Sequence, residues 1–313
     1  MYKYFITGGA GFIGSHLVDR LIGSGKVTVY DNLNSGRKEF IQQHLSKNNF
    51  QFIQADLLDF DTLNQAIANQ DIVFHLAANP DVRAGIANTN LDLQQGTLAT
   101  YNVLETMKVN KINKIVFASS STVYGEAGKK AVAEDYGPLL PISLYGASKL
   151  ACEGLISAFC HIFDMQAWIF RFANVVGSRS SHGVIFEFIN KLRQNPEELE
   201  ILGDGTQEKP YLYTSDCTDG ILFGLQHSRE QVNILNLGTD SSTNVSTIAS
   251  MLVEAMGLYG VKFTYTGGSR GWRGDVPQVR FDITKMKNMG WKPNYSSDGA
   301  VYKALRDILN SAM

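Results

Sequence analysis

The stretch TGGAGFIG, residues 7–14, decides how the rest of the chain is interpreted. It follows the apolar run KYFIT and precedes a segment whose apolar residues recur at helical spacing. Two glycine patterns fit it: G-x-G-x-x-G at Gly9, Gly11 and Gly14, and G-x-x-G-x-x-G at Gly8, Gly11 and Gly14. Either pattern predicts a strand, a tight turn and a helix whose free N–H groups bind phosphate.

Short apolar runs alternate with amphipathic segments downstream of this turn. The runs are KYFIT, KVTVY, FQFIQ, DIVFHLAA, KIVFASS and QAWIFRF. Strands that alternate with helices are typical of a parallel sheet with helices on both faces. The sequence therefore predicts an α/β fold, built on a doubly wound parallel Rossmann sheet with a smaller C-terminal α/β lobe.

The alternation weakens beyond about residue 174, where stretches rich in glycine and proline separate shorter elements. We predict a dinucleotide-binding domain over residues 1–173 and a second lobe over residues 174–313. A helix from Thr214 to His227 is expected to return to the first domain, so that about 211–231 rejoins it.

Composition excludes several classes of partner. A net charge of -2 in 313 residues provides no broad basic field, which argues against nucleic acid or an anionic membrane. No apolar run approaches the roughly 18 residues of a membrane span. The first residues pass directly from strand to turn and leave no room for a signal peptide, so we expect a soluble, cytoplasmic protein.

The cysteines and histidines point away from disulfides and metals. Cys152, Cys160 and Cys217 are odd in number and form no C-x-x-C pair, which predicts buried, reduced thiols. The six histidines lie far apart and match no zinc-ligand spacing, so no metal is expected and they are interpreted as structural or surface residues.

Asp31 ends the strand KVTVY. A carboxylate there accepts hydrogen bonds from ribose hydroxyls and repels a 2′-phosphate, which favours NAD over NADP. Arg37 and Lys38 follow closely and keep the NADP alternative open, and Asp31 as a solvated turn residue is the other alternative.

The G-x-x-G-x-x-G pattern calls for a Tyr and a Lys one helical turn apart. LYGASK supplies them as Tyr145 and Lys149, which a helix places on one face. The pair follows the strand that ends in ASSSTVYG, with its serines at 119, 120 and 121. A surface pair is the alternative for a spacing that occurs often by chance.

At this point the chain resembles the extended short-chain dehydrogenase/reductase family, and most of all its nucleotide-sugar 4-epimerases, typified by UDP-glucose 4-epimerase. The resemblance is carried in family order by TGGAGFIGSH, DNLNSG, ADLLD, FHLAA, ASSSTVYGE, LYGASK, RFANVVG and GDGTQEKPYLY. It covers nearly the full length and implies retained NAD, a UDP-sugar substrate and a homodimer. It is less specific for the sugar.

The resemblance implies the functions of individual residues. The implied catalytic residues are Ser120, Tyr145 and Lys149, with Ser119 or Ser121 open in place of Ser120. The implied NAD contacts are Gly8, Gly11, Phe12, Ile13, Gly14, Asp31, Asn32, Asp56, Leu57, Leu76, Ala77, Ala78, Tyr145 and Lys149. The implied substrate contacts are Ser120, Ser121, Asn174, Lys209, Tyr211, Arg273, Asp275 and Val279. For Asp56, a helix cap is the alternative.

The implied reaction needs a base near neutral pH, because a sugar hydroxyl loses its proton as its carbon gives up hydride. Free tyrosine has a pKa near 10, so a phenolate at pH 7 requires about 4 kcal/mol of differential stabilisation. Lys149 and the oxidised nicotinamide are the expected sources of positive charge. Lys149 is also expected to hold the nicotinamide ribose.

Residues near the serines distinguish related reactions. Sugar 4,6-dehydratases of this superfamily carry an Asp-Glu pair where this chain has Ser121 and Thr122. We expect no acidic residue near the serine cluster, which also argues against decarboxylation of a uronate. Epimerisation of UDP-N-acetylhexosamine or UDP-uronate, another NAD-linked reductase or decarboxylase, and a non-catalytic NAD-binding regulator remain as alternatives.

Several positions depart from the family pattern. Gly96 stands where an asparagine is common, and LDLQQGT, residues 91–97, is expected to form a loop. Lys209 replaces a usual arginine, and lysine does not bind phosphate in the same bidentate way. The phosphate arginine is Arg270 or Arg273, with a slight preference for Arg273. Val279, where a bulky tyrosine goes with exclusion of N-acetylated sugars, suggests room for an N-acetyl group.

The expected homodimer would form through helices that include the Tyr145–Lys149 segment. The other face of that segment carries Leu150, Leu155 and Ile156. A core within one chain explains these apolar residues equally well.

Overall fold

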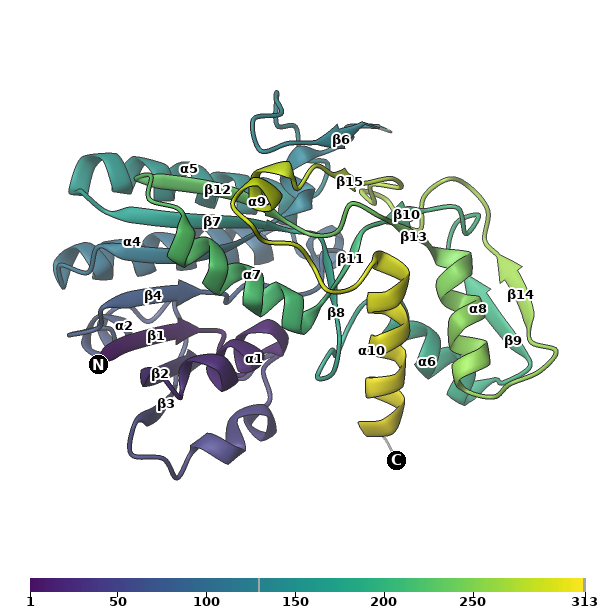
Figure 1. Ribbon diagram of the computed structural model, residues 1–313, viewed down its shortest axis with the longest axis horizontal. Helices are drawn as coiled ribbons and strands as arrows, with labels where there is room; N and C mark the ends of the chain where they lie inside the picture. Colours follow the sequence, from purple (N-terminus) through teal and green to yellow (C-terminus); the bar gives the residue numbers. More distant parts are fainter. Residues whose placement is uncertain (129, 312–313) are drawn as a thin grey trace. The chain divides into compact units, whose positions relative to one another are not determined.

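A seven-stranded sheet forms the centre of the fold, which a computed structural model describes for residues 1–128 and 130–311. The strands lie in the order β12-β7-β5-β4-β1-β2-β3 (Figure 1). Their bounds are β1 (Tyr2–Thr7), β2 (Gly25–Asp31), β3 (Phe50–Gln54), β4 (Ile72–His75), β5 (Lys114–Ser120), β7 (Gln166–Phe172) and β12 (Val232–Leu237). The α/β fold class is confirmed, and every strand predicted from the apolar runs is present.

The strand order shows where this fold binds ligands. From β1 the chain moves outward to β2 and β3, then returns to β4 on the other side of β1. β1 pairs in parallel with both neighbours, and Thr7 and His75 are partners at its carboxyl end. In doubly wound sheets, ligands bind outside the carboxyl ends of the strands at such a switch point. The glycine turn begins at this edge.

Helices connect these strands. Their bounds are α1 (Phe12–Leu21), α2 (Phe60–Ala66), α4 (Ala99–Val109), α5 (Leu144–Phe163) and α7 (Thr214–His227), with shorter turns at η1 (Lys38–His44), α3 (Ala84–Ala87) and η3 (Ser121–Tyr124). α4 packs against both α2 and α5. Apolar residues of α2, α4 and α5 and of the sheet form a buried core that includes Phe5, Val103, Phe117 and Ile156. The predicted helix from Thr214 to His227 is observed as α7.

The predicted loop at residues 91–97 is wrong. The chain there is helical and includes a π-helical stretch, η2 (Leu93–Leu98), which leads directly into α4. A π-turn is wider than an α-turn and often marks a functional site. An isolated glycine weakens a helical pattern, so Gly96 favours a loop in the sequence even though the fold accommodates it in a helix.

The chain divides into two compact units. Unit 1 comprises residues 1–123, 144–171 and 221–235, and unit 2 comprises residues 124–143, 172–220 and 236–313. The predicted boundary at 173/174 lies two residues from the break at 171/172. The predicted functions of the two parts stay predictions.

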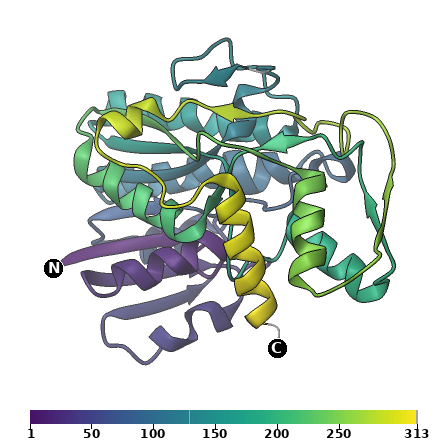
Figure 2. The ribbon, with the colours of Figure 1, turned by 45° about the vertical axis from the view of Figure 1, so that its right-hand side comes forward.

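Unit 2 is built from short strand pairs and helices. The strands are β6 (Ala131–Val132), β8 (Asn174–Val176), β9 (Glu198–Ile201), β10 (Glu208–Lys209), β11 (Tyr211–Tyr213), β13 (Thr243–Asn244), β14 (Lys262–Tyr265) and β15 (Arg280–Phe281). The helices are α6 (Val184–Gln194), α8 (Val245–Ala255), α9 (Thr284–Asn288) and α10 (Ser297–Ser311). α8 contacts α6, α10 and β9, and Figure 2 shows it in green beside the yellow α10. Their apolar faces form a second core around Leu199, Ile248 and Leu252.

The three cysteines are free and buried, as predicted. Burial raises the pKa of Cys160 to about 11 and also raises the pKa of Cys152 and Cys217. Thiols in such surroundings stay protonated and are poor nucleophiles.

In the part of the chain that the structure describes, no helix combines the length and the apolar character that crossing a membrane requires.

Candidate active site

The glycine turn is closed by its own backbone. Gly11 N donates to Gly8 O at 3.0 Å, and Gly8 has φ of +69°, a conformation that favours glycine. A Cβ at Gly8 would lie 2.7 Å from Ala77 N, and one at Gly14 would lie 2.1 Å from Gly8 O. These contacts explain why the first and last positions of the pattern must be glycine.

Space at the start of α1 suits a pyrophosphate. Gly11 is the N-cap residue and has no side chain to satisfy the first N–H groups of the helix. Those groups and the helix dipole favour an anion. Gly9 is also required, because a Cβ there would lie 2.7 Å from Val29 Cγ2.

Asp31 lies at the end of β2 and joins two loops. Its Oδ2 accepts from Ala10 N at 3.0 Å, and its Oδ1 accepts from Leu33 N at 2.9 Å. Burial raises the pKa of the carboxyl, although these two hydrogen bonds oppose that shift. A carboxylate has about four acceptor positions, so capacity remains for ribose hydroxyls. The alternative of a solvated turn residue does not fit a side chain that is buried.

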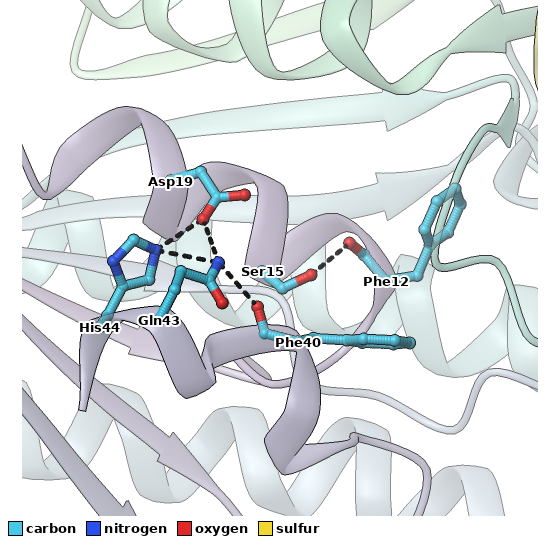
Figure 3. Close-up of polar contacts among 6 residues, drawn as sticks. All are labelled: Phe12, Ser15, Asp19, Phe40, Gln43 and His44. Carbon is cyan, nitrogen blue, oxygen red and sulfur yellow. Dashed lines mark hydrogen bonds and ion pairs between the residues drawn. The ribbon is translucent and has the colours of Figure 1, made fainter. Parts of the chain in front are cut away.

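The segment after Asp31 is held against α1. His44 Nε2 and Gln43 Nε2 lie 2.6 Å and 2.9 Å from Asp19 Oδ1, which joins η1 to α1 (Figure 3). His44 is buried, in agreement with a structural interpretation of the histidines. This contact supports the helix that follows the glycine turn.

Asp56 lies beside the end of β2. Its Oδ2 accepts from Asn32 Nδ2 at 2.8 Å, and its Oδ1 accepts from Leu58 N at 2.9 Å. The helix-cap alternative falls on a different residue, because Asp59 is the N-cap of α2 and accepts from Thr62 N. Asn32 and Asp56, both predicted cofactor contacts, are therefore brought together.

His75 at the end of β4 is a buried structural residue. Its Nδ1 lies 2.7 Å from Thr7 Oγ1, and its Nε2 lies 3.0 Å from Thr100 Oγ1. Burial, with a smaller effect of Lys149, lowers the pKa of His75 to about 3. The imidazole is neutral at pH 7 and joins β1, β4 and α4 beneath the predicted contacts at Leu76, Ala77 and Ala78.

The three implied catalytic residues come together in unit 1. β5 ends at Ser120, and α5 begins at Leu144, one residue before Tyr145. The Ser120 side chain hydrogen-bonds Tyr145. Lys149 Nζ donates to Ala118 O at 2.7 Å and lies 5.7 Å from the centroid of the Tyr145 ring.

Neighbouring residues distinguish Ser120 from Ser119. Thr122 N and Oγ1 donate to Ser120 Oγ at 3.2 Å and 3.0 Å. Ser119 Oγ instead donates to Glu153 Oε1 at 2.5 Å and is buried. Successive residues of a strand point to opposite faces, so only one of this pair can face Tyr145.

A buried ion pair lies beneath this site, where we had expected no acidic residue. Glu153, one turn after Lys149 on α5, accepts from Arg171 Nε at 3.0 Å and Nη2 at 2.7 Å. The expectation was wrong because α5 packs against the end of β5, which sequence distance does not reveal. The spacing of four residues from Lys149 was the available signal.

Electrostatics at the pair oppose ionisation of Tyr145. Burial raises its pKa well above the ordinary value, the charge of Asp92 adds to this, and the hydrogen bond from Ser120 lowers it. Burial lowers the pKa of Lys149 to about 8, and its neighbours Cys152, Asp92 and Glu153 oppose that shift. These groups hold Tyr145 as a phenol, so a phenolate at neutral pH requires additional positive charge.

The predicted substrate residues form two contacts in unit 2. Asn174 and Tyr211 are partners on β8 and β11, and their side chains hydrogen-bond. Lys209 Nζ lies 2.5 Å from Asp275 Oδ1. Burial raises the pKa of Tyr211 to about 12.

The two candidate arginines differ in their surroundings. Arg270 Nη1 donates to Asp275 O at 2.7 Å, and its Nη2 pairs with Glu126. Arg273 is exposed, and Val279 is half-buried, with its N donating to Glu208 O at 3.1 Å. The geometry favours Arg270 over Arg273 as the arginine joined to Asp275.

Among residues 1–128 and 130–311, the structure shows no cluster of His, Cys, Asp and Glu that could hold a metal ion.

Comparison with known proteins identifies the family. A family model described as the NAD dependent epimerase/dehydratase family matches residues 4–238. The chain belongs to this family. A putative UDP-glucose 4-epimerase of Methanocaldococcus jannaschii is 36% identical over 314 residues and 98% of each chain.

Solved members of the family have the same fold. A crystal structure of a UDP-galactose 4-epimerase is 36% identical, with a TM-score of 0.87 over 99% of this chain and 100% of that one. A UDP-glucuronic acid 4-epimerase from Bacillus cereus, in complex with UDP-glucuronic acid and NAD, is 29% identical, with a TM-score of 0.89 over 99% and 100%. Relatives also include a UDP-N-acetylglucosamine 4-epimerase and a UDP-N-acetyl-alpha-D-glucosaminuronate decarboxylase. The family is therefore clear, and its members differ in substrate.

Proposed function

We propose that this family member is an NAD-dependent nucleotide-sugar 4-epimerase that interconverts UDP-glucose and UDP-galactose. The observation that carries the proposal is the assembly of Ser120, Tyr145 and Lys149 at the carboxyl edge of the sheet. A protein that only bound NAD would have no need of a buried tyrosine joined to a serine.

Each residue of the site would have a separate function in the reaction. As a phenolate, stabilised by the positive charges of Lys149 and of the bound nicotinamide, Tyr145 would take the proton of the sugar 4-hydroxyl and later return it, while Ser120 hydrogen-bonds the same oxygen. Lys149 supplies positive charge beside the phenol and holds the nicotinamide ribose. NAD⁺ bound at this site would supply the acceptor and donor of the hydride at the sugar 4-carbon. The glycine turn, Asp31 and Asp56 would bind the pyrophosphate, ribose and adenine.

Dehydration is disfavoured by the groups around Ser120. Ser121 and Thr122 provide no carboxyl group, and the Thr122 side chain is already bonded to Ser120 Oγ. Glu153 is an acid nearby, but Arg171 neutralises it, and it lies against Ser119. Neither arrangement supplies the additional acid and base that elimination of water needs.

We place the nucleotide contacts in unit 2. Asn174, Tyr211, Lys209 and Asp275 are the proposed contacts for the UDP group, and Arg270 replaces Arg273 as the phosphate arginine because of its bond to Asp275. Val279 supports acceptance of an N-acetyl group, because it is smaller than the tyrosine that goes with exclusion.

We also propose a homodimer formed through α4 and α5. Ile156, one of the residues first considered for that interface, is buried within unit 1 instead. Exposed apolar side chains on the two helices support the proposal: Tyr101, Val109, Ile162 and Phe163.

Proton NMR of the purified protein with UDP-galactose and no added cofactor tests the reaction. The expected result is the appearance of the anomeric signal of UDP-glucose until the two sugars reach equilibrium. Tyr145→Phe should reduce kcat by about 10³-fold, since general base catalysis contributes about 10²–10⁴. Tyr259→Phe, which alters a tyrosine that is 95% exposed, is the matched control and should retain activity.

The same spectra recorded with UDP-N-acetylglucosamine and UDP-glucuronate define the substrate. Conversion of one of these, with no change in UDP-galactose, would transfer the proposal to that sugar. An unchanged spectrum with all three, from protein that releases NAD on denaturation, would overturn the epimerase proposal. Failure with the N-acetylated sugar alone would remove the inference from Val279.

A further inference from the structure

Asp92 is a buried carboxylate that the proposed reaction does not yet use. It lies directly before η2 and is only 3% exposed. Its Oδ1 accepts from Asn79 Nδ2 at 3.0 Å, while Oδ2 has no hydrogen-bond partner among the described residues. A buried carboxylate that lacks a partner on one oxygen is costly, so a function for it must be sought.

Hydrogen bonds join Asp92 to the helix that carries the catalytic pair. Ser148, the residue before Lys149, donates through Oγ to Asp92 O at 2.8 Å. Thr97 Oγ1 lies 3.0 Å from the same Ser148 Oγ. The main chain of Asp92 is therefore held against α5 at the position of Lys149.

Gly96 makes this contact possible. A Cβ at residue 96 would lie 2.2 Å from Ser148 Oγ, so any larger residue there would displace the serine. The family asparagine that is replaced at this position would occupy the same space. With glycine at this position, Ser148 of α5 can hydrogen-bond the main chain of Asp92, which lies directly before η2.

The negative charge of Asp92 acts on both members of the pair. It raises the pKa of Tyr145 and the pKa of Lys149. The titratable groups that face the pair are Asp92 before η2, Cys152 and Glu153 on α5, and His75 on β4. Glu153 is paired with Arg171 and His75 is neutral, so Asp92 is the carboxylate with an oxygen left for Lys149 or a ligand.

We infer that Asp92 is a positioning residue: its buried carboxylate, held beside α5 by the hydrogen bond from Ser148 to its main chain, provides the negative charge that favours the ammonium form of Lys149. The inference rests on the proposed function, because it concerns the same catalytic pair. It gives Asp92 an effect on the pH at which the pair works, through Lys149 and Tyr145 rather than through contact with the reacting atoms.

Asp92→Asn removes the charge and little else. Asparagine keeps an oxygen for Asn79, and the bond from Ser148 goes to the main chain. We expect the whole pH profile of kcat/KM to move to lower pH by about one unit, because both pKa values fall when the negative charge is removed. Asp81→Asn is the matched control: it makes the same charge change at an exposed residue of the same segment and should leave the profile in place.

Binding of NAD⁺ to protein stripped of cofactor provides a second readout. With Lys149 at a pKa of about 8, the affinity measured by calorimetry should fall as pH rises through that value. In Asp92→Asn the fall should begin at lower pH, and in Lys149→Met the pH dependence over this range should disappear.

The outcomes separate the inference from the proposed function. A shift of both curves supports Asp92 as inferred. Lower activity or lower melting temperature with both curves in place would show a purely structural residue and overturn the inference, as would no change at all. If the wild type binds NAD⁺ but converts no UDP-sugar, the proposed function fails, and the calorimetric curve still tests Asp92.

Discussion

At the scale of single residues, this chain is constrained most tightly where backbone atoms approach each other. A Cβ at Gly14 would lie 2.1 Å from Gly8 O, which accepts from Gly11 N, and a Cβ at Gly8 would lie 2.7 Å from Ala77 N. No side chain fits between these atoms. The glycine pattern is therefore a steric requirement as well as a means of bringing the main chain close to a phosphate.

Gly14→Ala tests this crowding. Its Cβ would lie 2.1 Å from Gly8 O, which is backbone and cannot rotate away. We expect the variant to lose about 3 kcal/mol of stability and to retain no NAD after purification. Gly23→Ala is the control, because a Cβ there meets nothing within 4 Å, and it should alter stability by about 1 kcal/mol or less. Equal melting temperatures for the two variants would contradict the steric argument.

At the scale of elements, a buried network of hydrogen bonds and an ion pair joins β5, α5 and β7. Ser119 of β5 donates to Glu153 of α5, which pairs with Arg171 of β7. Lys149 adds a second bond from α5 to β5 through Ala118 O. Ser120 follows Ser119 on β5, and Tyr145 lies one helical turn before Lys149 on α5. The bonds made by Ser119 and Lys149 therefore help to set the distance between Tyr145 and Ser120.

Glu153→Gln should be strongly destabilising. It leaves Arg171 buried beside a neutral group, and breaking a buried pair costs about 3–5 kcal/mol. Glu105→Gln, which breaks the solvent-exposed pair with Lys108 on α4, should cost about 0.5 kcal/mol or less. Denaturant unfolding measures both. A loss in Glu153→Gln as small as in the control would mean that the pair contributes little to stability.

At the scale of the whole molecule, the described residues form a buried apolar cluster in each compact unit and leave apolar side chains exposed on α4 and α5. Each unit buries its own apolar cluster. The exposed side chains of α4 and α5 remain outside the first cluster, with Ile162 at 68% and Val109 at 54% exposed. Exposed apolar side chains on two helices that contact each other support the proposed interface.

Light scattering tests the proposed homodimer. Two chains of 34.5 kDa give an expected mass of about twice that value for the wild type. Ile162→Glu should shift the population to monomer, because it places a charge within the apolar surface. Tyr259→Glu, which alters a side chain 95% exposed in unit 2, should leave the dimer intact. A monomeric wild type at micromolar concentration would refute the proposal.

The sequence by itself determined the α/β class, the succession of six of the sheet strands along the chain, and the presence of the glycine turn and of the Tyr145–Lys149 pair. These features depend on local spacing: period 2 or 3.6 in the apolar residues, glycine where a turn demands it, and four residues between two side chains on one helix. These spacings are present in the sequence itself, so they can be interpreted without knowledge of the fold.

Only the tertiary structure decided which groups surround that pair. It showed that Ser120 rather than Ser119 bonds Tyr145, that Arg171 neutralises Glu153 and that Arg270 rather than Arg273 is joined to Asp275. It also showed that Asp92 accepts a hydrogen bond from Ser148, the residue before Lys149. Ser148 and Asp92 are separated by 56 residues in the chain, and no periodicity connects them. Their contact follows from the packing of η2 against α5. Packing depends on how the shapes and volumes of many side chains fit together, which the sequence pattern of either segment does not reveal.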